Sequence, residues 1–115
     1  MKNKIIAVDF DGTLCEDRYP EIGEANTDLM CALKVWQQHY GAKLILWTCR
    51  VGDRLDEAVE FCKQHGLIFD AVNENLPESI ERYGGDSRKI NADVYIDDKS
   101  KNYGFKLPYE KGGLI

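Results

Sequence analysis

The chain has 115 residues, of which 43% are hydrophobic and 30% charged, and its net charge is −5 at pH 7. This length predicts a single domain, 1–115, that can bury a core without disulfide or metal crosslinks. The acidic balance argues against nonspecific nucleic-acid binding, and the sequence has neither a membrane-spanning stretch nor a secretory signal pattern.

We therefore expect a cytoplasmic protein that does not bind membranes. Its four cysteines form no CxxC pair and are expected to be free thiols, as is usual in a reducing compartment.

Four apolar runs predict β-strands over residues 4–10, 42–48, 67–72 and 92–98. The first two runs are almost continuously apolar rather than alternating, which is typical of strands buried on both faces of a parallel sheet. Residues 102–115 alternate in polarity and predict an edge strand, because a proline in them cannot donate to a central ladder.

The segments between the runs predict helices over residues 26–41, 52–66 and 76–85. The first has one apolar face, a start at Asn26 or Thr27 and an end at Gly41. The second is expected to be capped by Asp53 and to stop at Gly66, and the third has a proline near its first turn. Both tryptophans, Trp36 and Trp47, are expected in the core.

Alternation of strands and helices predicts an α/β fold, a three-layer Rossmann-like open parallel sheet with helices on both faces. The intervals between the strands leave no room for a cap domain. Residues 15–25 are expected to form a flap beside the site, from which Arg18 and Tyr19 could contact substrate.

Polar side chains follow three of the predicted strands. Because parallel strands end at one rim of the sheet, where ligands bind, we expect these residues to meet there. They are Asp9 and Asp11 after the first run, Thr48 and Arg50 after the second, and Asp97 and Asp98 in the last. Asp9 and Asp11 are two apart, so both side chains should leave the same face of an extended chain.

Carboxylates gathered this closely repel one another unless some are protonated or a cation lies among them. Hard oxygen ligands with few histidines favour Mg²⁺. Arg50 could bind a substrate phosphate or pair with Asp53. Each group also has a plainer interpretation. Asp9 and Asp11 could be solvated acids at a turn, Asp97 and Asp98 could simply end a strand, and Lys89 could be a solvated surface cation.

Over residues 4–98 the sequence resembles the haloacid dehalogenase-like (HAD) hydrolases. "DFDGTL" resembles their first motif, DxDGT, "LILWTCR" the second, an apolar strand ending in Thr or Ser, and "VYIDDKS" the fourth, an apolar strand ending in paired acids. The third motif, a lone basic residue, could be Lys89 or Arg88. An acid at the Asp11 position is typical of the family's phosphatases and phosphomutases.

The resemblance implies a Mg²⁺-dependent phosphohydrolase that works through an aspartyl-phosphate on Asp9. Asp11 would act as general acid and then as general base. Mg²⁺ would be held by the Asp9 side chain, the Asp11 backbone carbonyl and the Asp97 side chain, with Asp98 in support. Thr48 would bind a phosphoryl oxygen, and Lys89 would offset negative charge.

The position of Lys89 leaves alternatives open, because it lies only eight residues before Asp97. Eight extended residues span about 26–29 Å, so Lys89 reaches the rim only if the chain turns tightly around Asn91. Arg88 is the first substitute, followed by Lys99 and Lys101.

Without a cap the site should be open unless another subunit covers it, so a homo-oligomer is one expectation. The substrate could be a small phosphorylated molecule or a macromolecular phosphate. Two other functions remain open: a receiver-like phosphoacceptor module for signalling, and a non-catalytic protein that binds phosphate or metal.

Overall fold

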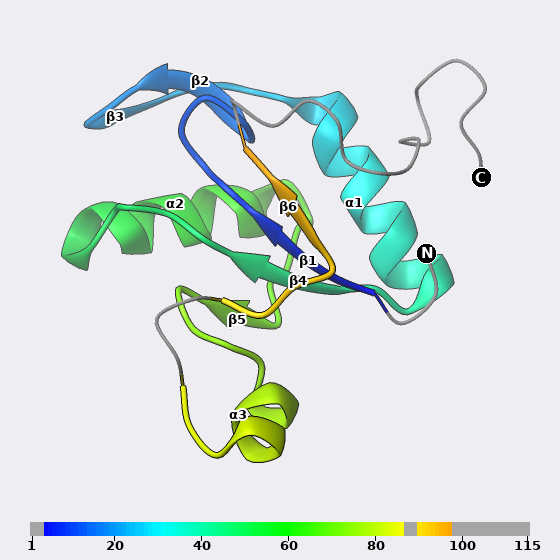
Figure 1. Cartoon of the computed structure of the whole chain (residues 1–115). Helices are drawn as coiled ribbons and strands as arrows, with labels where there is room; N and C mark the ends of the chain where they lie inside the picture. Colours follow the sequence, from blue (N-terminus) through cyan, green and yellow to red (C-terminus); the bar gives the residue numbers. More distant parts are fainter. Residues whose placement is uncertain (1–3, 87–89, 98–115) are drawn as a thin grey trace.

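Four parallel strands form the central sheet of the computed structural model, which describes residues 4–86 and 90–97 (Figure 1). In order across the sheet they are β5 (Ala71–Val72), β4 (Lys43–Leu46), β1 (Ile5–Val8) and β6 (Val94–Ile96). In the register, Val8 lies beside Leu46 on one side and Ile96 on the other. β1 is therefore buried between two neighbours, as its apolar sequence predicts.

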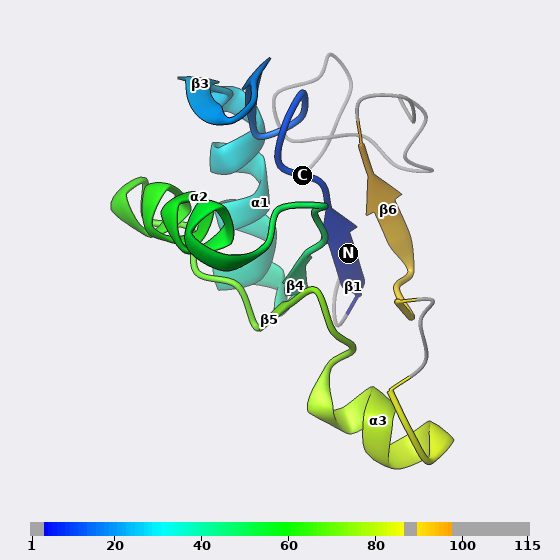
Figure 2. The same ribbon diagram turned by 90° about the vertical axis from the view of Figure 1, so that its left-hand side faces the viewer.

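Helices cover both faces of this sheet. α1 (Thr27–Tyr40) and α2 (Gly52–Gln64) pack against the face that presents Ile6, Val8 and Leu46. Leu76, at the start of α3 (Pro77–Tyr83), packs with Ala7 and Ile45 on the opposite face. Figure 2 shows α1 and α2 together on one side and α3 away from them. The predicted α/β Rossmann-like sheet is confirmed.

The ends of α1 are those that its sequence predicts. The Asn26 side chain accepts a hydrogen bond of 3.2 Å from the Leu29 amide, which satisfies one of the donors left open at a helix start. Gly41 adopts a left-handed conformation with φ of 71°, and its amide donates to the Trp36 carbonyl. Trp36 is buried, as expected.

Two predictions about element ends and burial were wrong. α2 begins at Gly52 with Val51 as its N-cap, so Asp53 lies in the first turn instead of capping the helix. Trp47 is not in the core: it is 40% exposed and packs against the ring of Tyr95, 5.5 Å away. It follows the last residue of β4, where the sheet meets solvent.

The third apolar run, residues 67–72, is strand only at its end. The Asp70 carboxylate accepts a hydrogen bond of 2.8 Å from the Leu44 amide, and the Asp70 amide donates to the Leu44 carbonyl. Ladder pairing begins after this side-chain contact, at Ala71 and Val72. Of the apolar residues before it, Leu67 is buried and Phe69 packs against the core, whereas Ile68 is 52% exposed.

The segment between β1 and α1 is more ordered than a loop. β2 (Cys15–Arg18) and β3 (Glu21–Ala25) form an antiparallel hairpin at the end of the sheet where β1 stops (Figure 1). A polar run such as CEDR gave no apolar pattern from which to predict a strand. In the described part of the chain, no domain is inserted beyond this hairpin, and no helix has the length and apolar character needed to cross a bilayer.

Candidate active site at the carboxyl ends of the strands

The order of the strands creates a switch point beside β1. The chain passes from β1 to β4 on one side and later reaches β6 on the other side. In open α/β sheets, ligands bind outside the carboxyl ends of the strands at the point where the direction of winding reverses. The topology therefore places the candidate site between the ends of β1 and β6.

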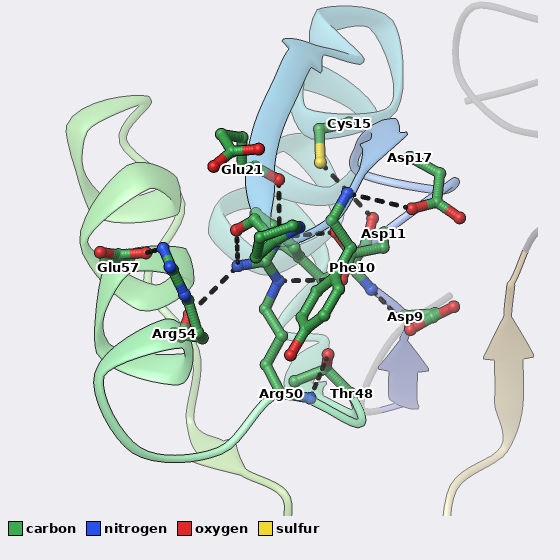
Figure 3. A network of polar contacts seen from close by, with 12 residues as sticks. Asp9, Phe10, Asp11, Cys15, Asp17, Glu21, Thr48, Arg50, Arg54 and Glu57 are labelled. Carbon is green, nitrogen blue, oxygen red and sulfur yellow. Dashed lines mark hydrogen bonds and ion pairs between the residues drawn. The ribbon is translucent and has the colours of Figure 1, made fainter.

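Asp9 and Asp97 occupy this switch point. They follow Val8 and Ile96, which are paired in the register, and the Asp9 amide extends the ladder by donating to the Ile96 carbonyl at 2.9 Å. Both residues are half-buried. The Asp9 carboxylate accepts a hydrogen bond of 2.8 Å from the Phe10 amide, and it points toward β6 (Figure 3).

Thr48 lies at the end of the neighbouring strand. The Trp47 amide donates to the Val8 carbonyl at 2.9 Å, so β4 continues beside β1 to this point. The Thr48 hydroxyl accepts a hydrogen bond of 3.2 Å from the Arg50 amide. A hydroxyl that accepts in this way keeps its proton to donate to another oxygen.

Asn73 positions this loop and was missed in the sequence. Its side-chain oxygen accepts a hydrogen bond of 2.7 Å from the Thr48 amide, and its own amide donates to the Leu46 carbonyl. Its φ is 53°, a left-handed conformation that asparagine tolerates better than most residues. The sequence signal that could have indicated this role was an asparagine directly after the apolar run over residues 67–72.

Asp11 forms a bidentate ion pair with Arg50. The two carboxylate oxygens accept from Nη2 at 2.8 Å and from Nε at 2.9 Å. The Arg50 side chain is 1% exposed and that of Asp11 is 18% exposed. Hydrogen bonds to Asp11 raise the pKa of Arg50, which keeps the guanidinium charged although it is buried.

The remaining donors of Arg50 bind backbone carbonyls. They reach Glu21 at 2.9 Å, Pro20 at 3.2 Å and Arg54 at 3.4 Å. The guanidinium carbon also lies 5.1 Å from the centre of the Phe10 ring and 5.0 Å from that of Tyr19. This arrangement does not fit the expectation that Arg50 binds a substrate phosphate or pairs with Asp53.

The turn after β1 separates the two acids of the first motif. Gly12 has a φ of 82°, and its amide donates to the Cys15 carbonyl at 2.9 Å. The turn directs the Asp11 side chain toward Arg50, whereas the Asp9 carboxylate points toward β6 (Figure 3). The prediction that both side chains leave one face was therefore wrong, because the chain is not extended beyond Phe10.

The proposed metal ligands can be placed only in part. Among residues 4–86 and 90–97, no group of three or more His, Cys, Asp or Glu side chains is close enough to hold a metal ion. Of the predicted set, the described residues include two carboxylates, Asp9 and Asp97, and the Asp11 backbone carbonyl, whereas the supporting Asp98 lies outside them. Mg²⁺ commonly binds one or two carboxylates and completes its shell with water and substrate phosphate, so this donor set fits it.

Several predicted residues lie outside the described ranges. They are Asp98, Lys89, Arg88, Lys99, Lys101 and the edge strand over residues 102–115. Of the flap residues, Tyr19 is 59% exposed and covers Arg50, and Arg18 is exposed with its guanidinium 3.7 Å from Glu16.

No protein-family model and no curated protein matches the chain. A solved structure from Bacteroides thetaiotaomicron, described as that of a conserved protein, is similar to it with a TM-score of 0.76. The two sequences are 46% identical over 89% of this chain and 81% of the Bacteroides chain.

Proposed function

The chain belongs to the same family as the conserved Bacteroides thetaiotaomicron protein, and we propose that it is a Mg²⁺-dependent phosphohydrolase of the HAD type. One observation carries the proposal: Asp9 and Asp97 follow paired residues at the ends of β1 and β6, where a sheet of this topology binds its ligand. The resemblance of "DFDGTL", "LILWTCR" and "VYIDDKS" to the family motifs agrees with this placement.

The reaction would run in two displacements. An Asp9 carboxylate oxygen attacks phosphorus, the bond from phosphorus to the leaving oxygen breaks, and that oxygen takes a proton from Asp11. Water then attacks the aspartyl-phosphate and gives a proton to Asp11, which releases phosphate and restores both carboxyl groups. Bound Mg²⁺ would reduce the repulsion between Asp9 and the anionic phosphate.

Other residues of the rim would stabilise the transferring group. The Thr48 hydroxyl can donate to a phosphoryl oxygen, because the bond that it accepts from Arg50 leaves its proton available. Lys89, or Arg88 in its place, is proposed to offset charge on Asp9. The substrate is proposed to be a phosphate monoester, small or macromolecular, and an open rim is compatible with a homo-oligomer.

The test is a panel of phosphate esters assayed with Mg²⁺ and with EDTA. We expect hydrolysis that depends on Mg²⁺ and that Asp9→Asn abolishes with the fold intact. Asp28→Asn, an exposed aspartate on α1, is the matched control and should keep full activity. Full activity in Asp9→Asn would show that Asp9 is not the nucleophile.

A second candidate is a non-catalytic protein that binds phosphate or metal, and the Asp11–Arg50 pair favours it because both Asp11 oxygens are occupied. Binding of Mg²⁺ without hydrolysis across the panel would support it.

The receiver-like alternative is weaker. Receiver domains have the first strand between the second and third, whereas here it lies between the second and fourth parallel strands.

We further propose that the protein is cytoplasmic. Cys15, Cys31, Cys49 and Cys62 are all free, which is typical of proteins in a reducing compartment.

A further inference from the structure

Trp47 lies directly beside the proposed nucleophile. One residue follows the last register pair in each of β4, β1 and β6, and these residues form a row across the sheet: Trp47, Asp9 and Asp97. The Trp47 amide donates to the Val8 carbonyl at 2.9 Å. The Asp9 amide donates to the Ile96 carbonyl at 2.9 Å. The ladder therefore still holds at this row, where neighbouring strands lie about 4.8 Å apart.

The side chains of this row leave one face of the sheet. Side chains alternate along a strand, and the preceding residues, Leu46, Val8 and Ile96, all pack into the cluster under α1 and α2. The next residue of each strand therefore points to the opposite face. Trp47 agrees with this, because its ring packs 5.5 Å from that of Tyr95, which packs against the cluster on the opposite face.

The Trp47 ring is supported from one side and open on the other. Tyr95 supports it and is itself fixed by a hydroxyl that donates to the Ile90 carbonyl and accepts from the Ala92 amide at 3.3 Å. The planes of the two rings are inclined by 59°, and Trp47 is 40% exposed. α3, the described helix on this face, lies away from the carboxyl ends of the strands (Figure 2). The indole is therefore a preorganised aromatic surface, which a ligand can use at little entropic cost.

Position, rather than exposure, singles out Trp47. Single exposed apolar side chains are ordinary on a protein surface, and Tyr83 on α3 is 65% exposed. In the row at the rim, however, the two acids are neighbours and Trp47 takes the place on the other side of Asp9. A phosphate bound at Asp9 would thus have a neutral, flat surface beside it. Aromatic groups pack on such a ring in offset-stacked or edge-to-face arrangements.

We propose that Trp47 is a specificity-determining residue, whose indole stacks on a flat aromatic group carried by the phosphate monoester. The inference rests on the proposed function and names the class of substrate that the site prefers. The aromatic group can be a nucleobase carried on a sugar or a ring bonded directly to the ester oxygen. Both sources share one chemistry, and the choice of substrates separates them.

The experiment measures kcat/KM for adenosine monophosphate, phenyl phosphate and ribose 5-phosphate. We expect Trp47→Leu to lower kcat/KM by about tenfold for at least one of the two aromatic esters, which is the size of effect that one stacked base produces. The value for ribose 5-phosphate should change by less than about twofold, because this ester has no aromatic group to stack. Trp47→Phe keeps an aromatic ring and should lose less than Trp47→Leu.

The matched control is Tyr83→Leu, which removes an exposed aromatic side chain from α3 and should leave all three values unchanged. A loss confined to adenosine monophosphate identifies the group as a base, and a loss confined to phenyl phosphate identifies it as a ring on the ester oxygen. If Trp47→Leu lowers the value for ribose 5-phosphate as much as those for the aromatic esters, or lowers none of them, the proposal is overturned.

A measurement on the native tryptophan covers the case in which Trp47→Leu does not fold. Acrylamide quenches the fluorescence of exposed indoles, so it reports Trp47, which is 40% exposed, and not Trp36, which is 3% exposed. In Asp9→Asn, where turnover is expected to stop, an aromatic ester should reduce the quenching by about twofold, because a stacked ring covers the open face of the indole. Ribose 5-phosphate should not reduce it. Quenching that neither aromatic ester reduces overturns the proposal.

Failure of the proposed function looks different from failure of this inference. In the first case the wild type hydrolyses none of the three esters, or Asp9→Asn stays active, while an aromatic ester still protects Trp47 from acrylamide. In the second case hydrolysis depends on Mg²⁺ and on Asp9, but substitution of Trp47 does not discriminate between the aromatic esters and ribose 5-phosphate.

Discussion

Asp11 and Arg50 are 39 positions apart in the sequence and are joined by two hydrogen bonds of 2.9 and 2.8 Å, one to each carboxylate oxygen. The pair connects the turn after β1 to the loop between β4 and α2. Because Arg50 also binds the hairpin β2–β3, one buried cation fixes the surroundings of the candidate site.

Removing the anion of this pair should destabilise the fold. Asp11→Ala leaves the Arg50 charge buried without a counter-ion, and we expect the free energy of unfolding to fall by about 3 kcal/mol. The measurement is urea unfolding, with a lower midpoint at an unchanged m-value. Asp17→Ala, an exposed aspartate of the same hairpin, should change stability by less than about 0.5 kcal/mol. Equal midpoints for the two variants would contradict this role of Asp11.

The packing of the hairpin predicts that Gly23 tolerates no side chain. A Cβ atom at Gly23 would lie 2.5 Å from the Glu16 carbonyl oxygen and 2.6 Å from the Glu16 Cβ atom. Gly23→Ala must therefore push β3 away from β2, at a cost of about 1–3 kcal/mol. We expect faster cleavage by protease within residues 15–25, with the far-ultraviolet spectrum of the remaining fold retained.

Gly85→Ala is the control for this substitution, because a Cβ atom there meets nothing within 4 Å. It should be cleaved like the wild type. If Gly23→Ala is cleaved no faster than Gly85→Ala, the two strands are not packed as described.

Burial of Cys62 makes the fold sensitive to alkaline pH. Burial raises the pKa of this thiol from 9.0 to about 12. Between these values the unfolded chain loses the proton and the folded chain keeps it, so the stabilising contribution is full below pH 9 and is lost as pH rises toward 12. The free energy of unfolding should fall by up to about 1.4 kcal/mol per pH unit from this group.

Urea midpoints between pH 8 and 10 check this prediction, because the thiol begins to matter only above pH 9. Cys62→Ala removes the titrating group at the same buried position, and its stability should fall less steeply with pH than that of the wild type. Identical slopes would mean that the Cys62 thiol ionises equally easily in the folded and unfolded chain.

The sequence predicted the sheet better than the site. The buried strands and α1 follow from apolar patterns and caps, such as Asn26 and Gly41, that act over a few residues. The Asp11–Arg50 pair and the contact from Asn73 to Thr48 join residues that only the finished fold brings together. The hairpin was missed because its polar strands pair with each other and bury little apolar surface.

The position of Asp97 predicts its effect on magnesium binding. It follows Ile96, which is paired with Val8, so it lies beside Asp9 at the switch point. Asp97→Asn removes one of the proposed carboxylate ligands, and we expect Mg²⁺ affinity to weaken by about tenfold or more. Titration calorimetry with Mg²⁺ measures this directly, and the rise in Tm caused by Mg²⁺ should shrink in parallel. Asp28→Asn, on the exposed side of α1, should bind Mg²⁺ like the wild type. Equal affinities in the Asp97 and Asp28 variants would place the metal elsewhere. A divalent cation held by so few protein oxygens must lose affinity when one ligating carboxylate is removed.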